Sequence, residues 1–118
     1  MAILSSHTLD SVNGSHAGGV VVTLQRITTD GERTTVLTSA TDSGGRFSEE
    51  VDLSQANRED SYELVFSSGA YFESHTVASL SPRIVREVVI RFQMPDKDGR
   101  YHIPVILAPN SYSVWWSD

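Results

Sequence analysis

Short apolar runs separated by turn residues dominate the pattern along this chain. The clearest run covers residues 61–66, where Tyr62, Leu64 and Phe66 occupy every second position. Glu63 lies between them, on the other side of the alternation. A period of two predicts a β-strand with one face against a core and the other toward solvent.

Five further segments are rich in Val, Thr, Ile or aromatic residues and end at turn signals, and each is predicted to be a strand. They are residues 19–26, 34–41, 84–92, 101–107 and 111–116, and another strand begins at Arg46. The Asp30-Gly31 pair between the first two favours a hairpin turn. One short helix is expected around residues 70–74. Short strands with regular turn signals predict an all-β sandwich.

Residues 103–108, with the sequence Ile-Pro-Val-Ile-Leu-Ala, are apolar on both faces of their predicted strand. A sandwich strand with one solvated face alternates, so this strand is expected to be covered twice. The core provides the first cover. The second is either a partner subunit or a loop or the short helix of the same chain, and the pattern leaves both open.

The 118 residues suit a single domain that spans residues 1–118. The contents of 39% hydrophobic and 20% charged residues are ordinary for a globular protein. The net charge of −6 disfavours nucleic acid as a partner, because phosphates are also negative. The absence of cysteine excludes disulfides and Cys-based zinc sites, and it fits the cytoplasm, which is the location we expect. No apolar run approaches the roughly 18 residues of a membrane span, so no membrane partner is expected.

The candidates for chemistry are few, and each also has a purely structural interpretation. The four histidines, His7, His16, His75 and His102, show no metal-ligand spacing, so neither a metal site nor another cofactor is expected. His102 begins a strand that is predicted to be buried, and Arg46 follows a Gly-Gly turn. Taken alone, residues in such places are more often structural than catalytic.

Two adjacent indoles, Trp115 and Trp116, lie near the end of the sequence. Neighbouring residues on a strand point to opposite faces, so at least one indole is expected to need a partner surface. Either the indoles pack in the core and at an oligomer contact, or one of them forms a stacking wall for a planar ligand.

Five short segments carry a resemblance to one family. Residues 101–113, Tyr-His-Ile-Pro-Val-Ile-Leu-Ala-Pro-Asn-Ser-Tyr-Ser, resemble the C-terminal signature of transthyretins and 5-hydroxyisourate hydrolases, Tyr-His-Val-Pro-Leu-Leu-Leu-Ser-Pro-x-x-Tyr-Ser. Residues 7–10 are similar to the family's His-Val-Leu-Asp, and residues 41–46 to its Thr-Asp-x-x-Gly-Arg turn. Residues 14–20 and 69–72 resemble further family elements. The matches keep the family's order over nearly the whole chain.

The resemblance implies a transthyretin-like β-sandwich of two four-stranded sheets with one short helix, assembled as a homotetramer that is a dimer of dimers. In the family's hydrolases the sites lie in a channel at the dimer–dimer interface, and His7, Arg46 and His102 occupy the positions of their catalytic residues. These enzymes open a small purine-derived heterocycle by adding water to a ring carbonyl. A histidine suits proton removal near neutral pH, and an arginine beside it disfavours the charged imidazolium.

The C-terminal segment departs from the family pattern. The hydrolases end in Tyr-Arg-Gly-Ser, which lines their site, whereas this chain has Trp115-Trp116-Ser117-Asp118 in the same places. A cationic wall therefore becomes aromatic and anionic. We expect Trp116, Ser117 and Asp118, together with Tyr112, to bind the substrate.

Two smaller departures accompany it: His16 stands where the family usually has Pro, and a few extra residues occur around 78–83.

The main expectation is a 5-hydroxyisourate hydrolase-like enzyme. One alternative is a divergent member that hydrolyses, cyclises or isomerises a different heterocycle in a biosynthetic pathway. The other is a non-catalytic ligand-binding carrier.

Overall fold

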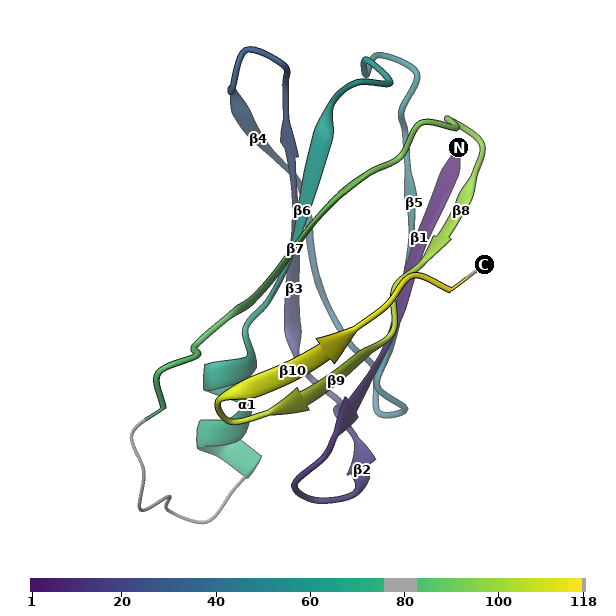
Figure 1. The fold of residues 1–118 in the computed structure, drawn as a ribbon. Coiled ribbons are helices and arrows are strands. Elements are labelled where there is room, and N and C mark those ends of the chain that lie inside the picture. Colours follow the sequence, from purple (N-terminus) through teal and green to yellow (C-terminus); the bar gives the residue numbers. More distant parts are fainter. Residues whose placement is uncertain (76–82, 118) are drawn as a thin grey trace.

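The computed structural model describes residues 1–75 and 83–117, and in them short strands accompany a single helix (Figure 1). The elements are β1 Ala2–Asp10, β2 Ser15–His16, β3 Val21–Ile27, β4 Arg33–Ala40, β5 Arg46–Val51, β6 Ser61–Phe66, α1 Ser68–His75, β7 Val88–Gln93, β8 Arg100–His102, β9 Val105–Ala108 and β10 Ser111–Val114. No helix in this part of the chain is long and apolar enough to cross a membrane.

The first sheet is built around β1, which has partners along both edges. β5 and β2 pair antiparallel with one edge, and β8 and β9 pair parallel with the other. β8 and β9 are two halves of one strand, because both pair with β1 at the same sequence offset. The break falls at Pro104, which has no N–H to donate. Counted in this way, the sheet has the four main strands that the resemblance predicted, in the order β5, β1, β8/β9 and β10, and β2 extends the edge.

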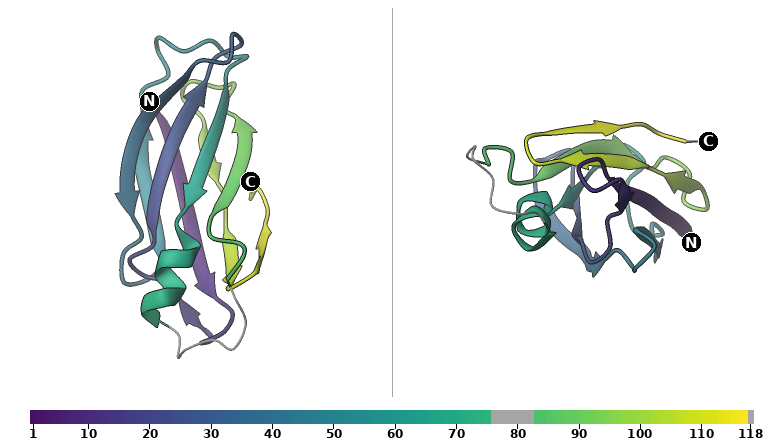
Figure 2. Two further views of the ribbon diagram at one scale, coloured as in Figure 1. Left: turned by 90° about the vertical axis from the view of Figure 1, so that its left-hand side faces the viewer. Right: turned by 90° about the horizontal axis from the view of Figure 1, so that it is seen from below.

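The second sheet is antiparallel, in the order β4, β3, β6 and β7. Figure 2 shows the two sheets as facing layers. Tyr62, Leu64 and Phe66 of β6 are buried between them, which confirms the alternation predicted for residues 61–66. The prediction of an all-β sandwich is confirmed.

The helix α1 follows β6 at one end of the sandwich (Figure 1). Its Tyr71 and Phe72 side chains are buried in the core, and the Tyr71 hydroxyl donates a 2.7 Å hydrogen bond to Asp10 Oδ2. The helix therefore contacts the core side of β1. A partner subunit, a loop or the short helix was considered as the second cover of residues 103–108. The helix α1 does not lie over the outer face of this strand.

Strand β1 was not predicted, because several of its core-facing side chains are polar and the apolar residues therefore do not alternate along it. Ser6, Thr8 and Asp10 are buried together with Ala2 and Leu4. Ser6 Oγ donates to the Ile103 carbonyl at 2.6 Å, and Thr8 Oγ1 donates to two backbone carbonyls at 2.9 Å. Since these hydrogen bonds satisfy buried polar groups, a strand interior carries residues that a hydropathy pattern assigns to solvent.

Three predicted strands differ most from the structure, whereas the bounds of β3 and β4 differ from the predicted ones by one or two residues. The strand expected to begin at Ile84 begins at Val88, because the Ile84 and Val85 amides donate to the Asn110 side chain instead of to a neighbouring strand. The strand expected over 101–107 is interrupted, as described above. The strand expected to extend to residue 116 ends at Val114.

Candidate functional site

Pairing between strands brings three of the predicted site residues onto one face of the first sheet. Residues directly opposite one another on paired strands point to the same side of a sheet. His7 of β1 lies opposite Arg46 of β5, and Ser5 of β1 lies opposite His102 of β8. Since the alternate residues of β1 are buried, His7, Arg46 and His102 all lie on the outer face.

The turn before β5 holds Arg46 beside β1. The Asp42 carboxylate accepts hydrogen bonds from the amides of Gly44 and Arg46, each at 2.9 Å. Gly45 has φ of +72°, and a Cβ at this residue would lie 2.4 Å from the Thr8 carbonyl oxygen. Thr8 N in turn donates to the Gly45 carbonyl at 2.7 Å. Only glycine permits this close approach, which explains why the Gly-Arg pair of the motif is needed here.

The surroundings of His7 favour its neutral form. Partial burial lowers its pKa below the usual 6.5, and the positive charge of Arg46 lowers it further. His16 and His102 act in the same direction, while a backbone hydrogen bond with Gly44 opposes them. An imidazole in this place is uncharged at neutral pH and able to accept a proton.

His102 is oriented by contacts at its ring and at its backbone. Its Nδ1 lies 2.8 Å from Ser5 Oγ, so the serine hydroxyl fixes the ring plane. Its carbonyl oxygen accepts a 2.9 Å hydrogen bond from Ser117 N, and the two residues form an antiparallel bridge. The bridge places Ser117 beside His102 on the outer face.

A fourth side chain, His16 of β2, belongs to this group and was not selected as a site residue from the sequence. Its Nδ1 lies 3.0 Å from His7 Nε2, and the two ring centroids are 5.0 Å apart. The only available signal was the departure from the family's usual Pro at this position. Among the described residues, no three His, Asp or Glu side chains form a cluster that would hold a metal ion.

Comparison with known proteins decides the family. The profile of the HIUase/Transthyretin family matches residues 4–116. The chain belongs to this family.

The relatives in this family include enzymes as well as transthyretin. A 5-hydroxyisourate hydrolase from Deinococcus radiodurans is 37% identical over 112 residues, which cover 95% of this chain and 92% of that protein. The structure of a 5-hydroxyisourate hydrolase from Klebsiella pneumoniae is similar with a TM-score of 0.71 at 28% identity, over the full length of both chains. Transthyretin from Sparus aurata gives a TM-score of 0.79 at 26% identity, over 97% of this chain and 95% of that chain. Since one fold serves both, the side chains of the site decide the function.

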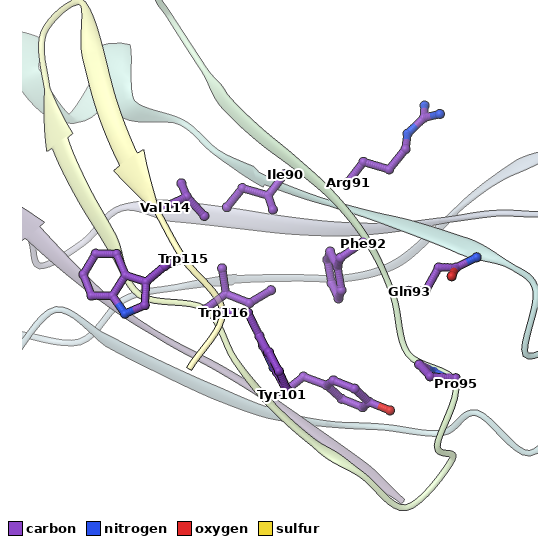
Figure 3. A pocket seen from close by; sticks show the side chains of 10 residues that line it. Ile90, Arg91, Phe92, Gln93, Pro95, Tyr101, Val114, Trp115 and Trp116 are labelled. Carbon is purple, nitrogen blue, oxygen red and sulfur yellow. The ribbon is translucent and has the colours of Figure 1, made fainter. Parts of the chain in front are cut away.

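The two indoles of the divergent terminus lie on different faces of the first sheet. The pairing of Val114 with Val105 and of Ser117 with His102 keeps one register, which places Trp115 opposite Pro104 on the outer face. Trp116 lies toward the other face, and Figure 3 shows it beside Tyr101 while Trp115 points away.

Trp116 lines a cavity of about 490 Å³ between the first sheet and β7, and Ile90 and Phe92 form part of its opposite wall. The indole that shares the face of His7 is therefore Trp115. Within one chain, the structure separates Trp116 from the three catalytic candidates.

The remaining predicted substrate-binding residues divide in the same way. Tyr112 lies opposite the buried Leu107, so its side chain is on the core side of the sheet edge and not on the face of the histidines. Ser117 lies beside His102. Asp118 and residues 78–82 of the extra segment lie outside the described residues.

Proposed function

We propose that this chain is a 5-hydroxyisourate hydrolase-like enzyme, which opens a cyclic amide by adding water to a ring carbonyl. The observation that carries the proposal is the placement of His7, Arg46 and His102 at neighbouring positions on one outer face. The 37% identity to a hydrolase supports the same reaction class.

The three residues have roles that follow from their chemistry. A neutral imidazole of the histidine group takes a proton from the attacking water, and the lowered pKa of His7 favours uncharged rings on this face. The guanidinium of Arg46 stabilises the negative oxygen that develops on the carbonyl. His102, held by Ser5, binds the substrate or returns a proton to the leaving ring nitrogen.

We also propose the homotetramer, a dimer of dimers, in which a second subunit covers this outer face. The two outer faces of the sandwich differ in a way that supports it. On the second sheet Glu63 accepts hydrogen bonds from Arg33 at 2.6 Å and from Arg91 at 2.8 Å, as is typical of a solvated face. The first sheet instead presents the half-buried Leu9 and Ile106 next to its histidines. A second subunit would exclude water from a small-molecule substrate there. A location in the cytoplasm stays a prediction.

The terminus favours one alternative. Trp115 places an indole on the outer face, where the family's hydrolases have tyrosine. A flat apolar wall suits a fused-ring substrate other than hydroxyisourate, which the same three residues would hydrolyse, cyclise or isomerise. A carrier without turnover is the remaining alternative.

The deciding experiment measures the decay of freshly generated 5-hydroxyisourate with and without the protein. We expect accelerated decay, and a loss of about 10²–10⁴-fold in each of His7→Ala, Arg46→Ala and His102→Ala, with circular dichroism unchanged. Decay at the spontaneous rate with the wild-type protein would contradict the hydrolase proposal. Saturable binding without turnover would instead support a carrier.

A further inference from the structure

The hydrogen bond between His7 and His16 constrains which nitrogen atoms are free for chemistry. A backbone hydrogen bond with Gly44 raises the pKa of His7. This is the effect of a carbonyl oxygen that accepts a hydrogen bond from a ring N–H. His7 Nε2 is the atom that faces His16, at 3.0 Å. Assigning the Gly44 contact to Nδ1 leaves the lone pair of the neutral ring on Nε2.

The partner atom in this pair is the donor. Since His7 Nε2 accepts, His16 Nδ1 carries the proton that it donates, and the lone pair of the neutral His16 ring is on Nε2. His16 is exposed, whereas His7 is half-buried. The only nitrogen of the pair with a lone pair open to an approaching molecule is thus His16 Nε2.

His16 lies next to a cavity in which a small molecule could approach this lone pair. His16 lies opposite Leu9 across the β1–β2 pairing, and β2 is fixed by the 2.9 Å hydrogen bond from Ala17 N to the Thr8 carbonyl. His16 lines a surface cavity of about 440 Å³ together with Leu9 and Ile106. Cavities of about 300–1,000 Å³ are usual for small ligands.

We propose that His16 is the catalytic proton acceptor and that His7 is the positioning residue behind it, an inference that rests on the proposed hydrolysis. As the water oxygen bonds to the substrate's carbonyl carbon, the water proton moves to His16 Nε2 and the carbonyl electron pair moves to oxygen. The His16 Nδ1 proton shifts toward His7 Nε2, so the two rings share one positive charge. When the tetrahedral species collapses, the C–N bond breaks and a proton returns to the leaving nitrogen.

Other charged groups face the pair. Arg46 lies opposite His7 on β5, and His102 lies on β8 across β1. Asp10 is near the cavity, but its carboxylate accepts hydrogen bonds from Asn13 and Tyr71. The positive charge of Arg46 opposes a full proton on His7, so the charge is expected to be largest on His16, nearer to solvent.

The test is His16→Asn, which keeps an amide donor at the place of Nδ1 but removes the nitrogen that accepts the proton. The matched control is His75→Asn, the same change on α1, where the ring stacks on Tyr71 away from the pair. We expect kcat/KM for hydroxyisourate to fall by about 10²-fold or more in His16→Asn and to stay near the wild-type value in His75→Asn. A near-native rate in folded His16→Asn would overturn the proposal, because the donor alone would then be sufficient.

A second measurement does not depend on turnover. It is a nitrogen NMR titration of the His7 ring in the wild-type protein and in His16→Asn. In His16→Asn the pKa of His7 should rise, because a neighbouring positive charge has been removed. An unchanged His7 titration would overturn the pair. If the wild-type protein shows no turnover but the pKa of His7 rises in His16→Asn, the hydrolase proposal fails while the pair itself is supported.

Discussion

Burial and the positive charge of Arg46 together determine how the His7 ring should respond to acid. Burial of the ring is the largest cause of its lowered pKa, and Arg46 is the next. Because the pKa of His7 in the folded protein lies below the usual 6.5, the ring stays neutral to a lower pH than a free histidine does.

Arg46→Ala should raise the pKa of His7 toward 6.5 and move the acid limb of any residual activity to higher pH. Arg46→Lys keeps a positive charge and should retain most of the shift. Proton NMR titration of the His7 ring measures both variants. Equal His7 titrations in the alanine and lysine variants would show that burial alone lowers the pKa.

Gly45 permits a second comparison at the scale of single residues. Gly45→Ala forces a left-handed backbone on alanine and places its Cβ 2.4 Å from the Thr8 oxygen. Gly31→Ala has the same kind of backbone, with φ of +87° and open space around the added Cβ. We expect Gly31→Ala to cost about 1–2 kcal/mol in free energy of unfolding, and Gly45→Ala to cost clearly more. Urea unfolding of both variants measures these free energies. Equal losses of stability would mean that the contact between the added Cβ and Thr8 is relieved at no cost.

Among the elements, α1 is joined to β1 by a buried hydrogen bond from the Tyr71 hydroxyl to Asp10. Burial raises the pKa of Asp10, but hydrogen bonds from the Asn13 amides and the Tyr71 hydroxyl outweigh this and hold it below 3.8. The resulting stabilisation is complete above pH 3.8 and is lost as the pH falls through the folded value.

Tyr71→Phe removes the hydroxyl that Asp10 accepts from. A hydrogen bond to a charged group contributes about 1.5–3 kcal/mol, so the variant should unfold more easily by about that amount at pH 7. Tyr112→Phe, at the half-exposed edge of β10, is the control and should change stability by less than about 0.5 kcal/mol. The difference in stability between Tyr71→Phe and the wild-type protein should become smaller in acid. Thermal unfolding at pH 7 and pH 3 measures this difference, and an equal difference at both pH values would contradict the assignment.

The elements also show which parts of the fold and of the site could be predicted from the sequence and which could not. β6 was predicted correctly because large apolar residues fill its buried positions. β1 was missed because Ser6 and Thr8 fill the equivalent positions and satisfy their hydroxyls inside the sheet. For the site, His7 and Arg46 came from the resemblance and not from periodicity. His16 escaped because its role depends on a pairing between β1 and β2 that only the three-dimensional structure reveals.

At the scale of the whole molecule, the outer face of the first sheet should be an interface between copies of the chain. Light scattering at micromolar concentration should give the mass of four 13.0 kDa chains, about 52 kDa. Ile106→Asp, on that face, should lower the mass, whereas Val89→Asp, an exposed change on the second sheet, is the comparison. A monomer mass for the wild-type protein would contradict the assembly.

The central place of β1 has a consequence for the order in which the protein acquires its shape during synthesis. Its partners include residues 46–51 and both halves of the strand around Pro104, so its second edge stays open until the last fifth of the sequence has been made. The second sheet needs only residues 21–93. A nascent chain should therefore complete the layer without the histidines first, and the layer that carries them last.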